Sequence, residues 1–224
     1  MASAADCSIC DDINQQGLNC KPPKLSSTGK LVLGIGATIA TVIYGIAIPF
    51  VLPGFRKICL PFIPATDQQI ANILRCLEGR SGSIVDLGSG DGRIILSVMK
   101  ANMAGNSGFK LTKADGVELN SWLVLYSKFS TWRHRNVIAK DSVSFYKRDI
   151  FKTNMNLYDN IVVFGVDSLM IELESKLNSD LKENSLVLAC RFPLPNWKPI
   201  HIEGDGIDKV WVYDRRSNNL DTPV

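Results

Sequence analysis

The sequence predicts one α/β domain with a mainly parallel sheet, preceded by a single helix that spans a membrane. Three observations lead to this fold class. From residue 67 onward, apolar runs of strand length alternate with apolar positions at helical spacing, which is the pattern of βαβ units. A turn with three glycines at alternating positions joins the first strand to its helix. An uncharged stretch of 22 residues, 31–52, precedes this domain.

The uncharged stretch is long enough to cross a bilayer. As a helix it spans about 33 Å, against about 30 Å for a hydrocarbon core. It is too long and starts too late for a secretory signal peptide, and its uniformly apolar faces argue against a buried core helix. We therefore divide the 224 residues into five parts. These are a disordered segment at 1–30, a transmembrane helix at 31–52, a proline-rich connector at 53–66, the α/β domain at 67–216 and a tail at 217–224.

The elements of the domain follow from periodicity and from capping residues. Thr66 and Gln69 form a capping box at the start of the first helix, and Ser168 is expected to cap a later helix that extends to about Leu181. A glycine turn near the C-terminus predicts an antiparallel hairpin of edge strands. We expect helices at 67–77, 93–101, 122–135 and 168–181, parallel strands at 83–87, 114–119, 142–146, 160–166 and 185–190, and hairpin strands at 198–203 and 209–213.

The glycine turn indicates the ligand. A dinucleotide fold requires G-x-G-x-x-G, but Arg93 stands where that pattern places its third glycine, which disfavours a nicotinamide-dependent reductase. An acid, Asp86, precedes G-x-G-x-G instead, and this resembles the S-adenosylmethionine turn of Rossmann-like methyltransferases. A sulfonium cation without phosphate suits an acidic turn. The expected cofactor-binding residues of this turn are Asp86, Gly88, Ser89, Gly90 and Gly92.

Acidic residues also follow the next two predicted strands. Ligands of open α/β sheets bind beyond the carboxyl ends of the strands. There Asp86 would face the methionine amino group, and Glu118 would accept from the ribose hydroxyls. Asp149 would accept from the adenine amino group, with apolar contact from Ile150 and Phe151. Each acid alone is also consistent with an ordinary exposed residue at a strand end.

Net charge and cysteine content limit the classes of ligand and partner that we expect. The net charge of +3 is too small to argue for nucleic acid. Basic residues gather in 133–152, which is either a solvated helix end and loop or a face toward anionic lipid headgroups. Cys7, Cys10 and Cys20 lack a nearby fourth ligand, so we expect no metal site.

Longer motifs resemble the small membrane-anchored mitochondrial lysine methyltransferases. The matching stretches are CLPFIPAT (59–66), SIVDLGSGDGRI (83–94), GVELNSWLVLYS (116–127), FYKRDIFK (145–152), NIVVFGV (160–166), ACRFPLPNWKP (189–199) and GDGIDKVWVYD (204–214). The resemblance implies a seven-stranded Rossmann-like methyltransferase sheet, S-adenosylmethionine, trimethylation of a lysine in the ATP synthase c subunit, and a single-pass location in the mitochondrial inner membrane.

One departure bears on the site. Residues 105–114 form a stretch about eight residues longer than in the family, so Glu118 is the ribose-binding acid only if the extra residues loop out. Asp115 is the alternative. The first thirty residues contain no arginine, unlike a cleaved presequence, so the membrane segment would act as an uncleaved mitochondrial signal.

The acceptor lysine must reach the methyl donor without its proton. We expect its channel between the end of the fourth strand and the segment after the fifth, with Phe164, Asp167, Phe192 and Trp197 as candidate substrate-binding residues. Phe192 and Trp197 could instead pack the hairpin, and no residue stands out as a catalytic base. Other interpretations are methylation of another membrane protein, such as the adenine nucleotide translocase, and a catalytically silent scaffold. Oligomeric state is not predicted.

Overall fold

The computed structural model describes residues 26–51, 63–105 and 107–219, and these divide into two compact units within 1–48 and 49–224. The expectations for residues 1–25, including Cys7, Cys10 and Cys20, lie outside the described residues. The same holds for most of the connector, 52–62, and for the end of the tail, 220–224.

The described residues of the first unit belong to the helix α2, which runs over Ser27–Val51. The segment 27–45 is long and apolar enough to cross a membrane, and none of its residues is buried within the described structure. The helix begins before the predicted residue 31 because Ser26 caps it: the Ser26 hydroxyl oxygen accepts a hydrogen bond from the Gly29 N–H at 3.1 Å.

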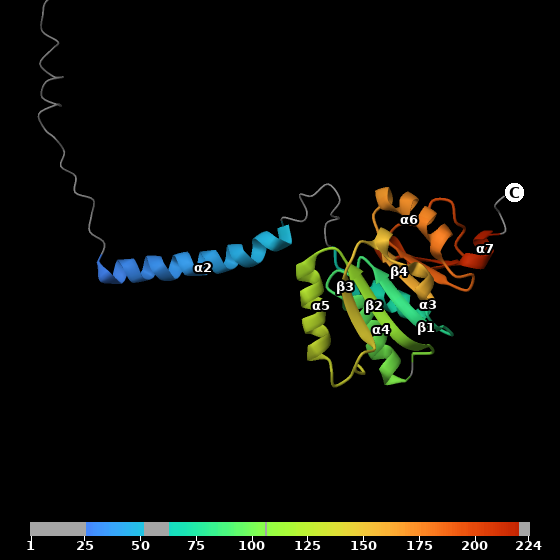
Figure 1. Cartoon of the computed structure of the whole chain (residues 1–224), viewed down its shortest axis with the longest axis horizontal. Helices are drawn as coiled ribbons and strands as arrows, with labels where there is room; N and C mark the ends of the chain where they lie inside the picture. Colours follow the sequence, from blue (N-terminus) through green and yellow to red (C-terminus); the bar gives the residue numbers. More distant parts are fainter. Residues whose placement is uncertain (1–25, 52–62, 106, 220–224) are drawn as a thin grey trace, which may run out of the picture. The chain divides into compact units, whose positions relative to one another are not determined.

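The second unit contains a seven-stranded sheet in the order β3-β2-β1-β4-β5-β7-β6 (Figure 1). The first five strands are parallel, and β7 and β6 run antiparallel to their neighbours. This arrangement confirms the predicted fold class. The strands are β1 Ser81–Leu87, β2 Lys110–Glu118, β3 Val143–Lys147, β4 Asn160–Phe164, β5 Leu186–Cys190, β6 His201–Glu203 and β7 Val210–Asp214.

Helices cover both faces of the sheet because successive strand residues alternate between two apolar cores. Ile84 packs with α3, α4 and α5, whereas its neighbours Val85 and Leu87 pack with α6. The helices are α3 Asp67–Cys76, α4 Arg93–Ala104, α5 Ser121–Arg133, α6 Asp167–Asp180 and the short C-terminal α7 Arg215–Asn219. Short 3-10 helices, η2 Ile150–Lys152, η3 Met155–Leu157 and η4 Gly206–Asp208, complete the connections.

Two capping expectations differ from the structure. Thr66 accepts from the Gln69 N–H as predicted, but the Gln69 side chain donates to the Ile207 carbonyl at 3.3 Å instead of closing the box. The prediction that Ser168 caps α6 is wrong. The N-cap residue is Val166, and Ser168 lies within the first turn of the helix, because β4 ends at Phe164.

The long stretch after α4 is only partly a loop. The prediction that β2 starts at Ala114 is wrong, since residues 110, 111 and 113 already pair with β1. The register between the two strands shifts between Gly82 and Ser83, so Thr112 is the extra residue of a bulge. Glu118 is the last residue of β2.

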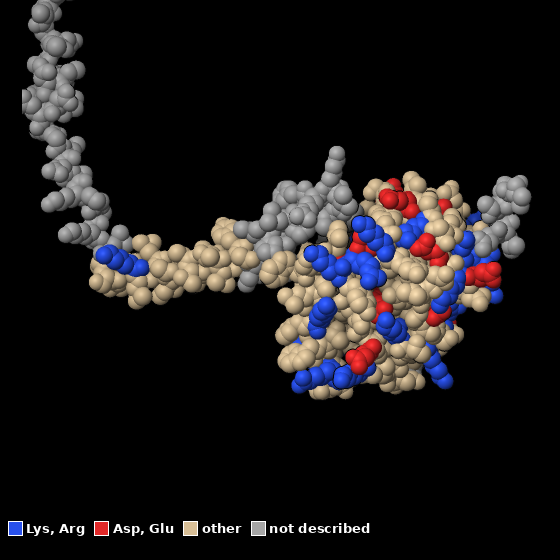
Figure 2. Space-filling view, viewed as in Figure 1, with Lys and Arg blue, Asp and Glu red and all other residues tan. Residues whose placement is uncertain are grey.

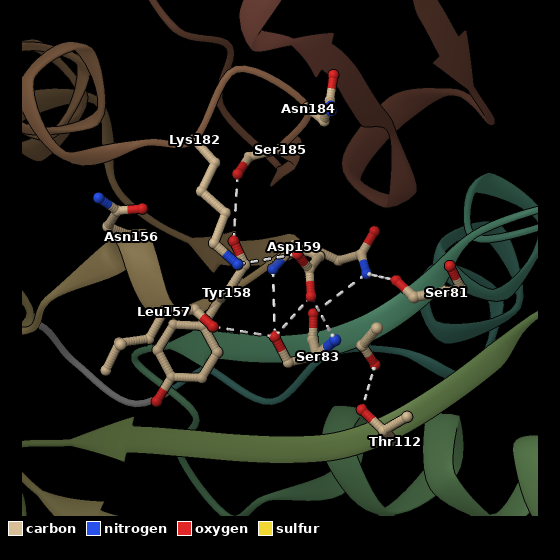
Figure 3. A network of polar contacts seen from close by, with 12 residues as sticks. Ser81, Ser83, Thr112, Asn156, Leu157, Tyr158, Asp159, Lys182, Asn184 and Ser185 are labelled. Atoms are coloured by element: carbon tan, nitrogen blue, oxygen red, sulfur yellow. Dashed lines mark hydrogen bonds and ion pairs between the residues drawn. The ribbon is translucent and has the colours of Figure 1, made fainter.

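A polar network fastens the amino ends of β1 and β4 (Figure 3). The Asp159 carboxylate accepts from the Ser83 N–H at 2.8 Å and from the Lys182 ammonium at 2.9 Å. Gly82, at φ +87°, permits this approach, because a Cβ there would lie 2.3 Å from an Asp159 oxygen. The network lies at the edge of the sheet opposite the carboxyl ends, so it stabilises the framework and leaves the glycine turn free.

Candidate functional site

The glycine turn lies directly after β1, at the carboxyl edge of the sheet. The N–H groups of Gly88 and Ser89 both donate to the Val117 carbonyl, at 2.9 and 3.0 Å, which ties the turn to β2. At Gly92, φ is +81° and an added Cβ would lie 2.6 Å from the Phe145 ring. The third glycine therefore provides both a left-handed backbone and close packing of α4 on the sheet.

Asp86 is the most unusual group of the site. It is fully buried, and neither carboxyl oxygen has a hydrogen-bond partner among the described residues. Burial, and then the nearby charges of Glu118 and Asp91, raise the pKa of Asp86 to about 8. A buried acid without partners is costly to a fold, so its presence beside a bare backbone turn indicates a ligand.

Ser89 adds a second unsatisfied group to the same turn. Its hydroxyl is buried and has no hydrogen-bond partner among the described residues. A Cβ on Gly116 of β2 would lie 2.8 Å from that oxygen, so Gly116 makes room for the turn. An acid that can face a cation and a hydroxyl that can donate or accept fit S-adenosylmethionine, whose amino group and sulfonium are positive.

Glu118 stands at the end of β2 beside the turn. One of its carboxylate oxygens accepts from the Gly90 N–H at 3.1 Å, and the other accepts from the Asn120 N–H at 2.8 Å. Asp115, the alternative acid, is buried in mid-strand, where it accepts from the Tyr158 hydroxyl and pairs with Lys113. The structure therefore brings Glu118, and not Asp115, to the glycine turn.

Asp149 follows β3 at the same edge. Its carboxylate caps η2 by accepting from the Phe151 N–H at 3.0 Å. Ile150 packs against the apolar core between the sheet and α6, which we call the α6-side core. Asp149 thus has a local structural role as well as a position along the carboxyl edge of the sheet, next to β2 and Glu118.

The residues expected to line an acceptor channel fall into two groups. Phe164 ends β4 and is half-buried, with the Arg191 guanidinium 5.8 Å from the centre of its ring. Asp167 is exposed at the start of α6, and Phe192 is partly buried after β5. These residues follow the carboxyl ends of neighbouring strands.

Trp197 is more deeply buried than the other candidates, and Phe192 packs against the same apolar core. The Trp197 ring meets that of Tyr213 edge-on at 6.1 Å, and the Arg215 guanidinium lies 5.7 Å from its centre. These contacts assign Trp197 to the packing of the hairpin and the α6-side core, which was the alternative that its sequence context left open.

Two side chains, Arg93 and Ser127, make contacts at the site that were not predicted from the sequence. The Arg93 guanidinium pairs with Asp91 of the turn and donates to the Ala65 carbonyl at 3.0 Å, so it links the turn to the segment that precedes α3. The buried Ser127 hydroxyl of α5 lies 3.2 Å from the Gly90 carbonyl. Ser127 had a sequence signal, namely one hydroxyl within the apolar face of a helix. The contact between Arg93 and Ala65 had none.

Comparison with known proteins agrees with this geometry. The family model described as ANTKMT methyltransferase domain matches residues 86–201. The human lysine N-methyltransferase named for the ATP synthase c subunit is 45% identical over 84% of this chain and 76% of its own length. The mouse adenine nucleotide translocase lysine N-methyltransferase is 40% identical over 72% of this chain and 68% of its own length.

A solved structure shares the fold. An RNA methyltransferase from Salinibacter ruber, in complex with S-adenosyl-L-homocysteine, superposes with a TM-score of 0.56 at 21% identity. The match covers 68% of this chain and 93% of that one. The acidic glycine turn, with Glu118 beside it, agrees with these relatives. The chain therefore belongs to the ANTKMT methyltransferase domain family and is an S-adenosylmethionine-dependent protein-lysine N-methyltransferase.

Proposed function

We propose that this protein trimethylates a lysine of the ATP synthase c subunit at the mitochondrial inner membrane. The observation that carries this proposal is the 45% identity, over 84% of the chain, to a curated enzyme named for that substrate. The relative named for the adenine nucleotide translocase is less similar, at 40% over 72%. The translocase is therefore the second candidate substrate.

The carboxyl edge of the sheet would hold the methyl donor. Asp86 would face the methionine amino group, Glu118 would accept from the ribose hydroxyls, and Asp149 would accept from the adenine amino group, with Ile150 against the ring. Gly88, Ser89, Gly90 and Gly92 would form the turn against which the donor lies. The unpartnered oxygens of Asp86 and the Ser89 hydroxyl support this assignment.

The acceptor lysine would enter beside Phe164, Asp167 and Phe192. When bound, S-adenosylmethionine supplies an electrophilic methyl group, which only an unprotonated amine can accept. An aqueous lysine has a pKa near 10.4, and a partly buried aromatic wall lowers it by desolvation. The same rings can hold a methylated ammonium by cation–π contact, which favours repeated methylation of one lysine.

A location in the inner membrane accounts for α2. Its exposed apolar residues 27–45 would anchor the chain as a single-pass protein. A lysine on a substrate embedded in that membrane stays at its surface, so the anchor raises the effective concentration of the enzyme there. Residues 1–30 and 53–66 would then be the flanking segment and the connector.

The test is a methylation assay with the full-length protein in detergent micelles or vesicles. Purified c subunit and purified translocase are each incubated with the enzyme and S-adenosylmethionine, and their lysines are read by mass spectrometry. We expect a mass gain of three methyl groups on one c-subunit lysine, and none with Asp86→Ala. Methylation of the translocase alone would replace the proposed substrate, and methylation of neither would overturn the proposal.

A further inference from the structure

The outward side of α5 is apolar although it faces solvent. Leu125, Tyr126, Phe129 and Trp132 recur at helical spacing along it, and each is more than half exposed. Val137, which follows the helix, is 54% exposed. We call these five residues the α5 outer face.

The opposite side of α5 already supplies the packing that the domain requires. Leu123, Val124 and Ser127 are buried, and Val124 packs in one apolar core with residues of α4 and of the sheet. A surface helix of a soluble domain places polar residues opposite its buried stripe, and a helix apolar on both sides has a second apolar contact. Stabilisation of the domain core therefore does not explain the α5 outer face.

Cations predominate around this face. The sequence from Ser121 to Lys140 contains no aspartate or glutamate, and its exposed cations are Lys128, Arg133, Arg135 and Lys140. The next residue, Asp141, is an exposed acid, so four cations stand against one acid. The Arg135 guanidinium lies 5.1 Å from the centre of the Trp132 ring, which itself stacks on Phe129 at 5.7 Å. In Figure 2 the strip of the domain where Figure 1 draws α5 is tan, interspersed with blue.

We propose that the α5 outer face docks on the headgroup region of an anionic lipid bilayer. Tryptophan and tyrosine are enriched where a membrane meets water, and arginine and lysine around them complement anionic lipid. A second copy of this chain is less favoured as the occupant, because the excess of exposed cations makes one copy of this face repel another.

The anchor keeps the domain within reach of such a surface. The 11 residues 52–62 join α2 to the first described residue of the domain unit. At no more than about 3.6 Å per residue they span about 40 Å at most. A bilayer that holds α2 therefore always lies close to the domain, and a weak second contact is sufficient to orient it.

Docking would also orient the methyl-donor site. The buried side of α5 reaches the glycine turn, where the Ser127 hydroxyl lies 3.2 Å from the Gly90 carbonyl. The α5 N-cap, Asn120, closely follows Glu118 and donates its N–H to that carboxylate at 2.8 Å. A bilayer against the outer face would thus fix the carboxyl edge of the sheet with respect to the membrane surface.

The experiment reads contact with lipid directly and is independent of methyl transfer. Full-length protein is reconstituted into vesicles whose phosphatidylcholine carries bromine on its acyl chains, with or without phosphatidylglycerol, and tryptophan fluorescence is recorded. We expect strong quenching that increases with phosphatidylglycerol and decreases at high salt. We expect Trp132→Phe to lower the quenching about twofold. The Leu125→Glu/Phe129→Glu double variant should remove most of the quenching that tryptophans of α5 contribute.

A matched control replaces an equally exposed apolar residue away from this face. Ile171→Glu on α6, at a position 65% exposed, is expected to leave the quenching unchanged. Circular dichroism checks that each variant is folded, and the single Phe129→Ser variant replaces the double variant if that fails to fold. The proposal is overturned if quenching is the same in wild type, Trp132→Phe and the glutamate variant. It is equally overturned if sedimentation shows a dimer that the glutamate variant dissociates.

Discussion

The backbone N–H of Gly90 donates to the side chain of Glu118 across 3.1 Å, so the last residue of β2 holds the middle of the turn that follows β1. The Asn120 N–H holds the other oxygen of the same carboxylate at 2.8 Å. Glu118 is thus oriented by two backbone donors before any ligand arrives. Such preorganisation reduces the conformational cost of binding.

Replacement of Glu118 tests its role as the ribose acceptor. Glu118→Ala removes a carboxylate that would accept two hydroxyl hydrogen bonds, and we expect it to weaken binding of S-adenosylhomocysteine about 10–100-fold. Glu118→Gln keeps an acceptor for the Gly90 N–H and should lose less of this affinity. Isothermal titration calorimetry measures both. Asp115→Asn, in mid-strand, is the comparison, and an equal loss of affinity there would argue against a specific role for Glu118.

The raised pKa of Asp86 predicts a pH dependence of stability. The folded protein without ligand keeps the Asp86 proton up to about pH 8, whereas the ordinary pKa of the group is 3.8. The contribution of this group is therefore complete below pH 4 and is lost as the pH rises to 8. Asp86→Asn carries no charge, so we expect it to raise the free energy of unfolding at pH 8 by on the order of 1–3 kcal/mol.

Thermal unfolding across this pH range, in the absence of donor, provides the measurement. The wild-type melting temperature should fall between pH 5 and pH 8 relative to that of Asp86→Asn, and the two curves should run parallel above pH 8. The same variant should bind donor more weakly, since the amide is not an anion. A variant that is both less stable at pH 8 and unaltered in donor binding would contradict both assignments.

Gly105, which follows α4, is a matched control for Gly92 of the glycine turn. Both have φ +81°, but a Cβ on Gly92 would lie 2.6 Å from the Phe145 ring, whereas no described atom lies within 4 Å of one on Gly105. Gly105→Ala should cost about 1 kcal/mol for the left-handed backbone alone. Gly92→Ala should cost about 2–4 kcal/mol, since overlap in a packed core adds to this. Urea unfolding compares them, and equal losses would mean that Phe145 moves aside.

The network around Asp159 should affect stability without affecting binding. Asp159→Ala leaves the Ser83 N–H and the Lys182 ammonium without their carboxylate, and we expect a loss of about 1–2 kcal/mol, since the site is partly exposed. Burial opposes ionisation of Asp159, but the hydrogen bonds from Ser83 and Lys182 outweigh it and lower the pKa of this carboxyl. Its contribution is therefore present at neutral pH and lost in acid. Unchanged affinity for S-adenosylhomocysteine is the internal control.

Much of the fold could be predicted because the core strands and helices have clear periods. The pattern failed where strand residues are polar. Residues 110–113 include two lysines and a threonine, and all of them except the bulge residue Thr112 pair with the equally polar Ser81–Ser83 at the amino edge of the sheet. No apolar run marks that part of β2, so the sequence pattern predicts its start at Ala114.

The site was predictable where chain order alone sets position. Asp86 and Glu118 lie at the carboxyl ends of β1 and β2, Asp149 follows β3, and parallel strands end at one edge. Contacts made by long side chains across the fold, such as Arg93 with Ala65, have no local signature. Trp197 illustrates a related limit, because an aromatic residue after β5 has the same sequence context whether it lines a channel or joins the core.

The Arg93 contact has a mechanical consequence. Ala65 lies just before α3, in the segment that follows the connector, and the Arg93 guanidinium links it to Asp91 of the glycine turn. If α2 is held in a bilayer as proposed, a displacement of the connector would reach the glycine turn through this side chain as well as through α3. Release and binding of the methyl donor would then be the steps that respond to curvature or crowding of the membrane.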